Sequence, residues 1–266
     1  MLTVLVISMP DDISRRKLIA NTLTEMSIPF SFVDAVIGKS LPPEIIDSFD
    51  FTSVIARKRR NITRGEIGCT LSHIKAYRKL IELEEKYALI LEDDVIIDHR
   101  FACFYKIVNT ESLNIDPRDL FILGGQNGID KSKFISRSYW YSKVIGGQRF
   151  KKTIKSEEYI FRTCCYIVTD FIAMKLLELS NKTFFIADEW AYFKTEKIIN
   201  DIYLSDMIDH PIDLSQSHIE CERIANAKRM NVPTQNFKSL LKKILFVHRV
   251  KEIIKLLRTT VRRFYL

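Results

Sequence analysis

The chain has 266 residues, of which 47% are hydrophobic and only eight are glycine and seven proline, so it can bury a large core and is neither disordered nor collagen-like. Its five cysteines form no CxxC pair and no zinc-finger spacing with histidine, which excludes a disulfide-stapled miniprotein and predicts reduced thiols in a cytosolic protein. The formal net charge of +8 resides wholly in residues 237–266, so residues 1–236 are neutral and no nucleic-acid-binding surface is expected.

The opening residues predict a strand, a helix and a second strand. The apolar run Leu2–Ile7 has the length of a strand, and a helical spacing of apolar residues follows from Ile13 to Met26 and ends before Pro29. Aromatic and β-branched residues resume over Phe30–Val36. Such an opening favours a parallel sheet covered by helices. The opening run has no basic leader, so we expect no secretory signal.

Residues 38–62 contain two prolines and a basic run at 57–60, which is typical of a surface loop or a short helix. Thr63–Glu66 has the form of a capping box, and the apolar spacing behind it predicts a helix from about Arg64 to Lys86. Ala88–Leu91 then predicts a buried strand, which we expect to continue through Val95–Ile97.

The second half of the chain predicts shorter elements. Residues 128–157 are polar, aromatic and basic without sustained periodicity, and we expect a long mobile segment on the active side that influences the choice of acceptor. The other predicted elements are strands over Asp119–Leu123, Tyr159–Thr169 and Phe184–Ala187, and a helix over Asp170–Ser180.

Three consecutive carboxylates, Glu92, Asp93 and Asp94, stand at the end of a predicted buried strand. Carboxylates so placed repel one another and lose hydration, so a bound cation is a natural compensation. Their hard oxygen atoms favour Mg²⁺ or Mn²⁺, which commonly bridge protein carboxylates to a substrate diphosphate. The alternative is an acidic turn that simply faces water.

Five short motifs follow one another between Leu2 and Ser217. They are Val6-Ile7-Ser8 with Arg15-Arg16, the helical segment Arg64–His73 with the pattern Glu-x-x-Cys-x-x-Ser-His, the acidic strand end Tyr87–Val95, the strand Thr163–Val168, and the turn Ile186-Ala187-Asp188. Together they resemble glycosyltransferase family 25, the bacterial lipopolysaccharide and lipooligosaccharide sugar transferases related to procollagen galactosyltransferases.

The resemblance implies a GT-A-like α/β domain over residues 1–236, with a mostly parallel central sheet flanked by helices and a UDP-sugar donor at the carboxyl ends of the strands. It implies Mn²⁺ or Mg²⁺ held first by Asp94, with Glu92 and Asp93 acting through metal, ribose or water. His210 or the later His218 would supply a third metal ligand or a phosphate contact. The remaining donor-binding residues implied are Ser8, Arg15, Arg16, Ser72 and His73, with the basic run at 57–60 as further candidates.

An inverting transfer also needs a base for the acceptor hydroxyl. The resemblance places Asp188 there, with Glu189 as the neighbouring alternative. Asp188 has the competing interpretation of a helix N-cap ahead of Trp190, and His73 that of a structural hydrogen-bonding residue. Ile186 stands where the family's turn has its proline, which puts the geometry of this turn in question.

The last thirty residues predict a basic amphipathic helix over 237–266. Such a helix can bury its apolar stripe in an anionic membrane surface. The alternative is that the stripe packs on the body or on a second subunit. The stripe consists of Leu240, Ile244, Val247, Val250, Ile254, Leu257, Val261 and Phe264.

These features predict a metal-assisted, inverting hexosyltransferase on the cytoplasmic face of the inner membrane. We expect galactose to pass from a UDP-sugar to a lipid-linked oligosaccharide, with no nucleic acid as partner. The same machinery could take UDP-glucose or a UDP-N-acetylhexosamine. The alternative from another class is an inactive, membrane-tethered scaffold of a glycan assembly complex.

Overall fold

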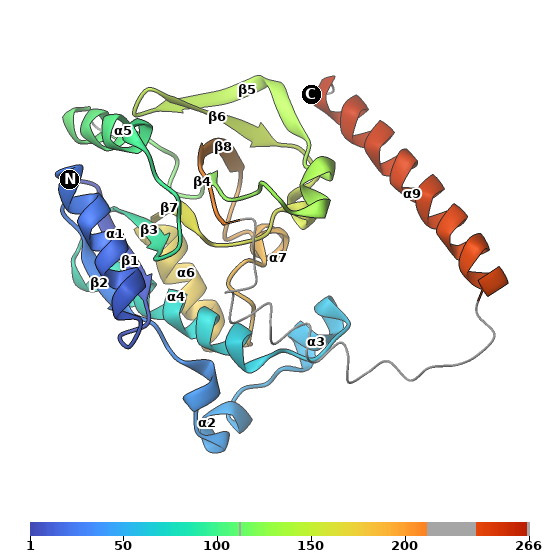
Figure 1. Cartoon of the computed structure of the whole chain (residues 1–266), viewed down its shortest axis with the longest axis horizontal. Coiled ribbons are helices and arrows are strands. Elements are labelled where there is room, and N and C mark those ends of the chain that lie inside the picture. Colours follow the sequence, from blue (N-terminus) through green and yellow to red (C-terminus); the bar gives the residue numbers. More distant parts are fainter. Residues whose placement is uncertain (112, 212–237, 265–266) are drawn as a thin grey trace.

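One sheet of eight strands runs through the molecule in the order β2-β1-β3-β7-β4-β8-β6-β5 (Figure 1). The computed structural model describes residues 1–111, 113–211 and 238–264, with side chains of the last range described from Lys251 onward. The strands are β1 (Thr3–Ser8), β2 (Ser31–Asp34), β3 (Tyr87–Glu92), β4 (Leu120–Gly124), β5 (Arg137–Ile145), β6 (Gln148–Thr153), β7 (Cys165–Thr169) and β8 (Ile202–Ile208).

Six of these strands point in one direction. The pairs β2–β1, β1–β3 and β4–β8 are parallel, whereas β7 runs antiparallel to β3 and β4, and β6 runs antiparallel to β8 and β5. The predicted α/β domain with a mostly parallel central sheet is therefore confirmed in the direction of its strands. The two reversed strands, β7 and β6, make four of the seven pairings antiparallel.

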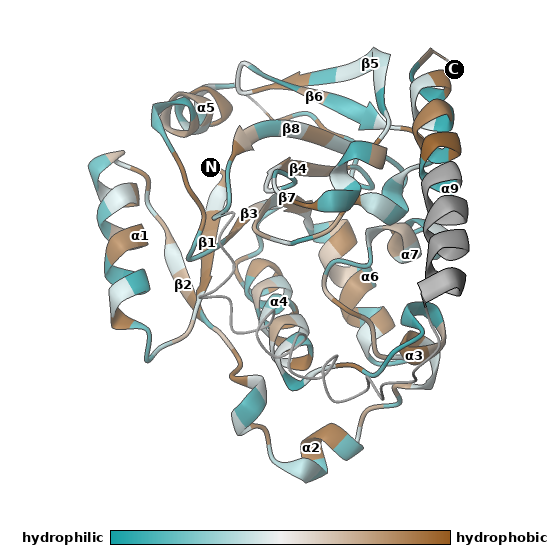
Figure 2. Cartoon of the chain, turned by 45° about the vertical axis from the view of Figure 1, so that its right-hand side comes forward, coloured by the Kyte–Doolittle hydropathy of each residue, from teal (hydrophilic) through white to brown (hydrophobic). Residues whose placement is uncertain are grey.

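Helices cover both faces of the sheet because the central strands are apolar on both. In β1, Leu5 and Ile7 pack with α4 (Arg64–Glu82), α6 (Asp170–Ser180) and α7 (Trp190–Thr195). Val4 and Val6 point to the other face, since side chains alternate along a strand. They pack with α1 (Ile13–Glu25) and α5 (His99–Thr110). Figure 2 shows the hydrophobic colouring of these central strands.

The predicted capping box starts α4. Thr63 Oγ1 accepts a hydrogen bond from the Glu66 backbone N–H at 3.1 Å, and Glu66 Oε2 accepts one from the Thr63 N–H at 3.0 Å. Arg60 also donates to both carboxylate oxygens of Glu66, at 2.8 and 2.5 Å. Reciprocal capping satisfies two N–H groups that the first helical turn would leave free. The helix begins at Arg64 as predicted and ends at Glu82.

Two glycines let α4 approach the segment that follows β2. A Cβ atom on Gly68 would lie 2.5 Å from the Val36 carbonyl oxygen, and one on Gly38 would lie 1.7 Å from the Arg64 carbonyl oxygen. Backbone therefore contacts backbone here, with no room for a side chain. This contact fixes the first turns of α4 beside the carboxyl end of β2. The short helices η1 (Gly38–Ser40), α2 (Pro43–Asp47) and α3 (Thr52–Lys58) connect the two elements.

Two predicted strands are too long, and a third does not form. Val95–Ile97 does not continue β3, because the chain turns after Glu92 and only Ile96 forms an isolated bridge, with Asp209. The predicted strand over 159–169 begins only at Cys165, because η3 (Glu157–Tyr159) and a positive φ of 68° at Arg162 precede it. Phe184–Ala187 forms no strand, because backbone N–H groups at 186 and 187 donate to side chains instead of to a neighbouring strand.

The segment 128–157, predicted as a mobile segment on the active side, is instead largely a hairpin. After the short helix η2 (Asp130–Phe134), β5 and β6 pair through a turn at Gly146 and Gly147, where positive φ angles of 55° and 72° suit glycine. The hairpin occupies the edge of the sheet farthest from β2. Strand β8 and helix α5 were also missing from the prediction.

The basic tail forms the predicted helix, α9 (Lys238–Phe264), which lies beside the body with its C-terminal end near β5 (Figure 1). The stripe residues 240, 244, 247 and 250 fall outside the described side chains. None of the described helices has both the length and the apolar character needed to cross a membrane.

Removal of the α4 cap tests whether the capping box stabilises the fold. Thr63→Ala should lower the free energy of unfolding by about 1 kcal/mol, because the Glu66 N–H loses its acceptor. The expected fall in Tm is about 2–4 °C for a domain of this size. Thr195→Ala is the control, since the exposed Thr195 hydroxyl bonds only the Ala191 carbonyl oxygen among the described residues. Equal Tm values for the two variants would contradict a stabilising cap.

Candidate active site

Polar side chains gather where the carboxyl ends of the parallel strands meet. Ser8 ends β1, Glu92 ends β3, and His210 follows β8. Because β7 is reversed, its beginning lies at this edge too, and the Glu92 N–H donates to the Cys164 carbonyl oxygen at 2.9 Å. The position agrees with the rule that ligands of open α/β sheets bind beyond the carboxyl ends of the strands.

A cavity of about 490 Å³ opens at this edge, between the strand ends, the first turns of α4 and the turn after α6. Its volume is in the range of small-molecule sites. No residue of the β5–β6 hairpin is among its described lining residues. Of the residues predicted for the site, those that line the cavity are Ser8, Arg15, Ser72, His73, Glu92, Asp93, Asp94, Asp188 and His210.

Asp93 is tied into the protein by two neighbours. Its Oδ2 accepts a hydrogen bond from Ser8 Oγ at 2.6 Å, and its Oδ1 lies 3.5 Å from Arg15 Nη1. Burial raises the pKa of Asp93, and the nearby carboxylates of Asp94 and Glu92 act in the same direction, against Ser8 and Arg15. Asp93 thus connects the ends of β1 and β3 and orients Arg15.

Asp94 faces His210 and Arg15. Its Oδ1 lies 3.5 Å from His210 Nε2, and its Oδ2 lies 3.5 Å from Arg15 Nη1. Burial raises the pKa of Asp94, but His210 and Arg15 outweigh burial, so the net pKa is lowered. Burial lowers the pKa of His210, and Asp94 more than reverses this, so its net pKa is raised. Asp94 is therefore held as a carboxylate.

Three of these side chains fit a hard divalent cation. Glu92, Asp94 and His210 each offer a ligand atom, and these atoms lie within 4.8 Å of one another. Asp94 Oδ1 is buried and has no hydrogen-bond donor, although buried carboxylate oxygens normally have one. Two carboxylates with one imidazole form a donor set suited to Mn²⁺. The residues predicted as metal ligands are thus together in space.

A second trio, Cys69, His73 and Glu92, shares the Glu92 carboxylate. His73 is fully buried, with Nδ1 2.7 Å from the Tyr166 hydroxyl and Nε2 3.4 Å from Glu92 Oε1. Thr163 Oγ1 also donates to Glu92 Oε1, at 2.5 Å. A thiolate ligand suits softer metals than Mg²⁺ or Mn²⁺. We therefore regard His73 and Thr163 as residues that orient Glu92.

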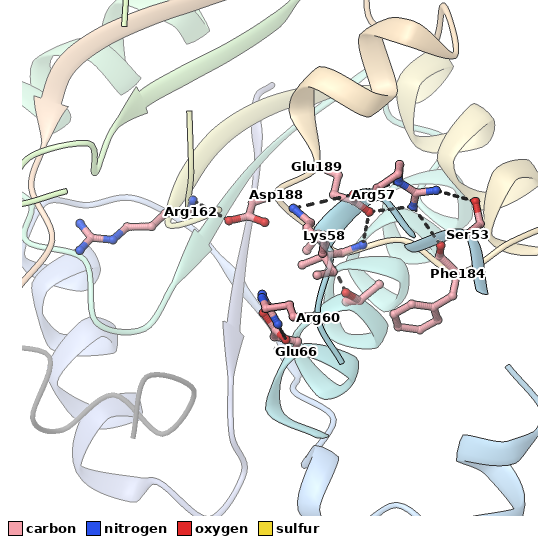
Figure 3. Close-up of polar contacts among 12 residues, drawn as sticks. Ser53, Arg57, Lys58, Arg60, Glu66, Arg162, Phe184, Asp188 and Glu189 are labelled. Carbon is pink, nitrogen blue, oxygen red and sulfur yellow. Dashed lines mark hydrogen bonds and ion pairs between the residues drawn. The ribbon is translucent and has the colours of Figure 1, made fainter. Parts of the chain in front are cut away.

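Asp188 lines the cavity from the turn between α6 and α7. It is half-buried, and its Oδ2 accepts a hydrogen bond from the Arg162 backbone N–H at 3.1 Å (Figure 3). The structure does not use Asp188 as an N-cap, since the residue before α7 is Glu189 and makes no capping bond with its side chain. Its carboxylate is thus positioned by a backbone group and still faces the cavity.

Glu189, predicted as an alternative base, has a different role. Its carboxylate is 4% exposed, does not line the cavity, and accepts hydrogen bonds from Arg57 Nε at 3.0 Å and Arg57 Nη2 at 2.9 Å (Figure 3). Lys58 Nζ lies 3.8 Å away, and the guanidinium of Arg57 also stacks on the Tyr192 ring at 3.7 Å. The carboxylate oxygens of Glu189 are thus bonded to Arg57, which lies away from the cavity lining, and Asp188 is the better placed of the two carboxylates.

The same carboxylate explains how the turn forms without the family's proline. The Ile186 N–H donates to Glu189 Oε2 at 2.9 Å, a bond that proline in this position could not make. The Ala187 N–H donates to Thr70 Oγ1 at 3.1 Å, which ties the turn to α4. Hydrogen bonds thus fix the backbone on both sides of Asp188.

Several predicted donor contacts are occupied elsewhere. Arg16 does not line the cavity, because it pairs with Asp34 at 2.9 Å and stacks on the Phe32 ring. Ser72 lines the cavity, but its hydroxyl accepts from the Val36 N–H and donates to the Gly68 carbonyl oxygen. In the basic run, Arg57 and Arg60 bond Glu189 and Glu66. His218 lies outside the described residues.

Arg162 is a cavity residue that the sequence analysis missed. Its guanidinium Nη1 donates to the Gly125 and Asn127 carbonyl oxygens, at 2.8 and 3.1 Å, while its backbone holds Asp188. Its backbone has a φ of 68°, a conformation that is unusual for a residue with a side chain and is visible only in the structure. No pattern in the one-dimensional sequence announces it.

The model of glycosyltransferase family 25, described as LPS biosynthesis protein, matches residues 1–191. Procollagen galactosyltransferase 2 from Mus musculus is 35% identical over 91 residues, which are 33% of this chain and 15% of that protein. A putative glycosyltransferase from Haemophilus influenzae is 36% identical over 94 residues, 34% of this chain and 31% of that protein. The chain thus matches a third or less of these two relatives' own length.

Solved structures are more distant. A glycosyltransferase involved in the glycosylation of the major capsid of PBCV-1 is 14% identical, with a TM-score of 0.40, over 84% of this chain and 98% of that one. An inositol-1-phosphate CTP transferase from T. maritima is 10% identical, with a TM-score of 0.44, over 88% and 98%. At such scores these likenesses add nothing to the geometry described above.

Two neighbouring substitutions separate the roles of the turn's carboxylates. Glu189→Gln should lower the free energy of unfolding by about 2 kcal/mol, because a buried charge-assisted contact with Arg57 is weakened. Asp188→Asn should change it by less than about 0.5 kcal/mol, since the amide oxygen can still accept the Arg162 N–H. Urea unfolding of both variants checks this. A larger loss for Asp188→Asn than for Glu189→Gln would contradict the assignment.

Proposed function

The chain belongs to glycosyltransferase family 25, and we propose that it transfers galactose from UDP-galactose to a lipid-linked oligosaccharide, with metal assistance and inversion of configuration. The observation that carries the proposal is a cavity lined both by Glu92, Asp94 and His210, whose ligand atoms lie close together, and by Asp188, whose carboxylate is held by the Arg162 N–H. A transferase needs such an arrangement, because one set of groups stabilises the charge on the leaving diphosphate while a different group accepts the proton of the attacking hydroxyl.

Glu92, Asp94 and His210 would hold the divalent ion, Mn²⁺ or Mg²⁺. When bound, such an ion neutralises negative charge on the donor diphosphate and on the UDP that leaves. Asp94 is supplied as a carboxylate by its cationic neighbours, and Thr163 and His73 orient Glu92. This preorganisation limits the rearrangement that ligand binding would require.

Arg15 is the cation best placed to assist the leaving group. It lines the cavity and lies between Asp93 and Asp94, at 3.5 Å from each carboxylate. A bidentate guanidinium suits phosphate oxygens, and a positive charge near the departing UDP stabilises the charge that develops there. Arg15 therefore replaces the basic run at 57–60 as the proposed phosphate contact.

Asp188 is the proposed general base. Its half-buried carboxylate faces the cavity and is positioned by the Arg162 N–H. In an inverting transfer this carboxylate accepts the proton of the acceptor hydroxyl as the oxygen attacks the anomeric carbon, while the bond to UDP breaks on the opposite face. The rigid turn between Ile186 and Glu189 keeps the carboxylate in place.

The choice of galactose and of the acceptor rests on the relatives. The vertebrate relatives are named procollagen galactosyltransferases, and the family description names LPS biosynthesis. We propose a cytoplasmic site of action, supported by Cys103, Cys164 and Cys165, which form no disulfide among the described residues. UDP-glucose and UDP-N-acetylhexosamines belong in the donor panel of any assay.

The metal ligands are tested by UDP release from UDP-galactose in Mn²⁺, in Mg²⁺ and in EDTA. We expect release with either metal, none in EDTA, and at least a hundredfold loss in Asp94→Asn, because one carboxylate ligand is removed. Asp206→Asn is the control, since Asp206 is exposed on β8 and pairs only with Arg137 among the described residues. Equal rates in metal and EDTA would contradict a metal-assisted reaction.

The base is tested separately from donor binding. Asp188→Asn should bind UDP with Mn²⁺ within about twofold of the wild type in calorimetry. It should transfer at least a hundredfold more slowly, because proton transfer by a positioned side chain contributes roughly 10²–10⁴ to the rate. Normal turnover in Asp188→Asn would exclude it as the base. If no UDP-sugar is turned over and UDP does not bind with metal, the chain is the inactive scaffold.

A further inference from the structure

Helix α9 contacts the body through its polar side. The Thr259 side chain is buried, and its Oγ1 donates to the Phe134 carbonyl oxygen at 3.3 Å. Ser136 Oγ donates to the Thr259 carbonyl oxygen at 3.0 Å, and Lys133 pairs with Glu252 at 3.3 Å. Polar and charged side chains therefore make this junction, which is unusual for an amphipathic helix against a protein body.

The apolar side of the helix consequently faces outward. Leu257 and Val261 stand two residues before and after Thr259, which places them on the opposite side of a helix. Their exposed fractions are 60% and 51%. The alternative, that the stripe packs on the body, does not hold for Leu257 and Val261, whereas Phe264 of the stripe contacts Tyr139 of β5. The exposed residues, which we call the α9 apolar face, are Ile253, Ile254, Leu256, Leu257, Val261 and Phe264.

One aromatic residue of β5, Tyr139, continues this face. The ring of Phe264 lies 5.1 Å from the ring of Tyr139, which is 52% exposed. Figure 2 shows hydrophobic turns in the C-terminal half of α9, at the edge of the molecule beside β5. An exposed Tyr next to aliphatic residues is typical of surfaces that enter a membrane–water interface.

Basic side chains flank the apolar face. Lys251, Lys255 and Arg258 are exposed on α9, and Arg262 and Arg263 are partly exposed. On the neighbouring hairpin, Lys151 lies 5.8 Å from the Tyr139 ring. Long basic side chains can extend from such a face to lipid phosphates while their methylene stems stay in the apolar layer.

We propose that the α9 apolar face and Tyr139 of β5 form one surface that docks on an anionic lipid bilayer. Charge favours a bilayer over a second copy of the chain, because a twofold interface would bring the same basic flanks against each other. On a bilayer these flanks meet phosphate groups of opposite charge. The apolar face enters the interface without removing Thr259 from the body. Docking needs neither donor nor metal, so it stands or falls independently of the transferase activity.

The test is co-sedimentation of the full chain with vesicles, without nucleotide or metal. Vesicles contain phosphatidylcholine alone or with about 30% phosphatidylglycerol. We expect at least tenfold tighter binding to the anionic vesicles, and a loss of that difference in high salt because the attraction is screened. Failure of the wild-type chain to bind anionic vesicles would overturn the proposal.

A pair of double variants distinguishes binding through this surface from non-specific binding through any exposed apolar residue. Leu257→Ser with Val261→Ser should weaken binding to anionic vesicles at least tenfold, because two aliphatic side chains no longer enter the lipid. The matched control is Ile13→Ser with Leu18→Ser, which changes two residues of α1 that are 74% and 67% exposed. We expect the control to bind like the wild type, and all variants to keep the wild-type Tm.

Two results in these variants would overturn the proposal. One is equal vesicle binding by the wild type and the α9 double variant. The other is a wild-type dimer in analytical ultracentrifugation that the α9 double variant converts to monomer while vesicle binding stays absent. The second result would identify the face as an interface between copies of the chain.

Discussion

The accumulation of negative charge at the end of a buried strand is the constraint on which the site depends. Glu92, Asp93 and Asp94 follow one another at the edge of the sheet, where burial makes each unpaired charge costly. The protein compensates each one differently: Ser8 and Thr163 donate hydrogen bonds to Asp93 and Glu92, and cationic groups face Asp94. One oxygen of Asp94 remains without a donor. That oxygen lies 3.5 Å from His210 Nε2, and Asp94, His210 and Glu92 together could hold a metal ion.

The position of Asp188 follows from a second set of contacts. Glu189 uses its buried charge to bind Arg57 and the Ile186 N–H, and Thr70 binds the next N–H. The two adjacent carboxylates thus have different roles. Glu189 fixes the turn, and Asp188 faces the cavity. The fold supports these two roles, because α3 brings Arg57 to Glu189 (Figure 3) and α4 brings Thr70 to the Ala187 N–H.

Much of this arrangement was predictable from the sequence. The apolar run of β1, the capping box of α4 and the acidic end of β3 are local signals, and together with the family's motifs they predicted that Asp94, His210 and Asp188 share a site. Sequence reasoning was wrong where tertiary contacts decide. The partner that binds Glu189 is Arg57, which lies 132 positions away in the sequence and so leaves no local signal. Strands β5 and β6 pair although neither alternates cleanly between apolar and polar residues. The left-handed backbone of Arg162 likewise has no local signature.

The most direct test of the metal site is a Mn²⁺ titration followed by electron paramagnetic resonance, in which free Mn²⁺ gives the signal. With UDP present, the wild type should remove one Mn²⁺ per chain from solution, and His210→Gln should weaken that binding about 10–100-fold because one of three ligands is lost. A wild type that leaves all Mn²⁺ free in the presence of UDP would contradict the account of Glu92, Asp94 and His210 as metal ligands.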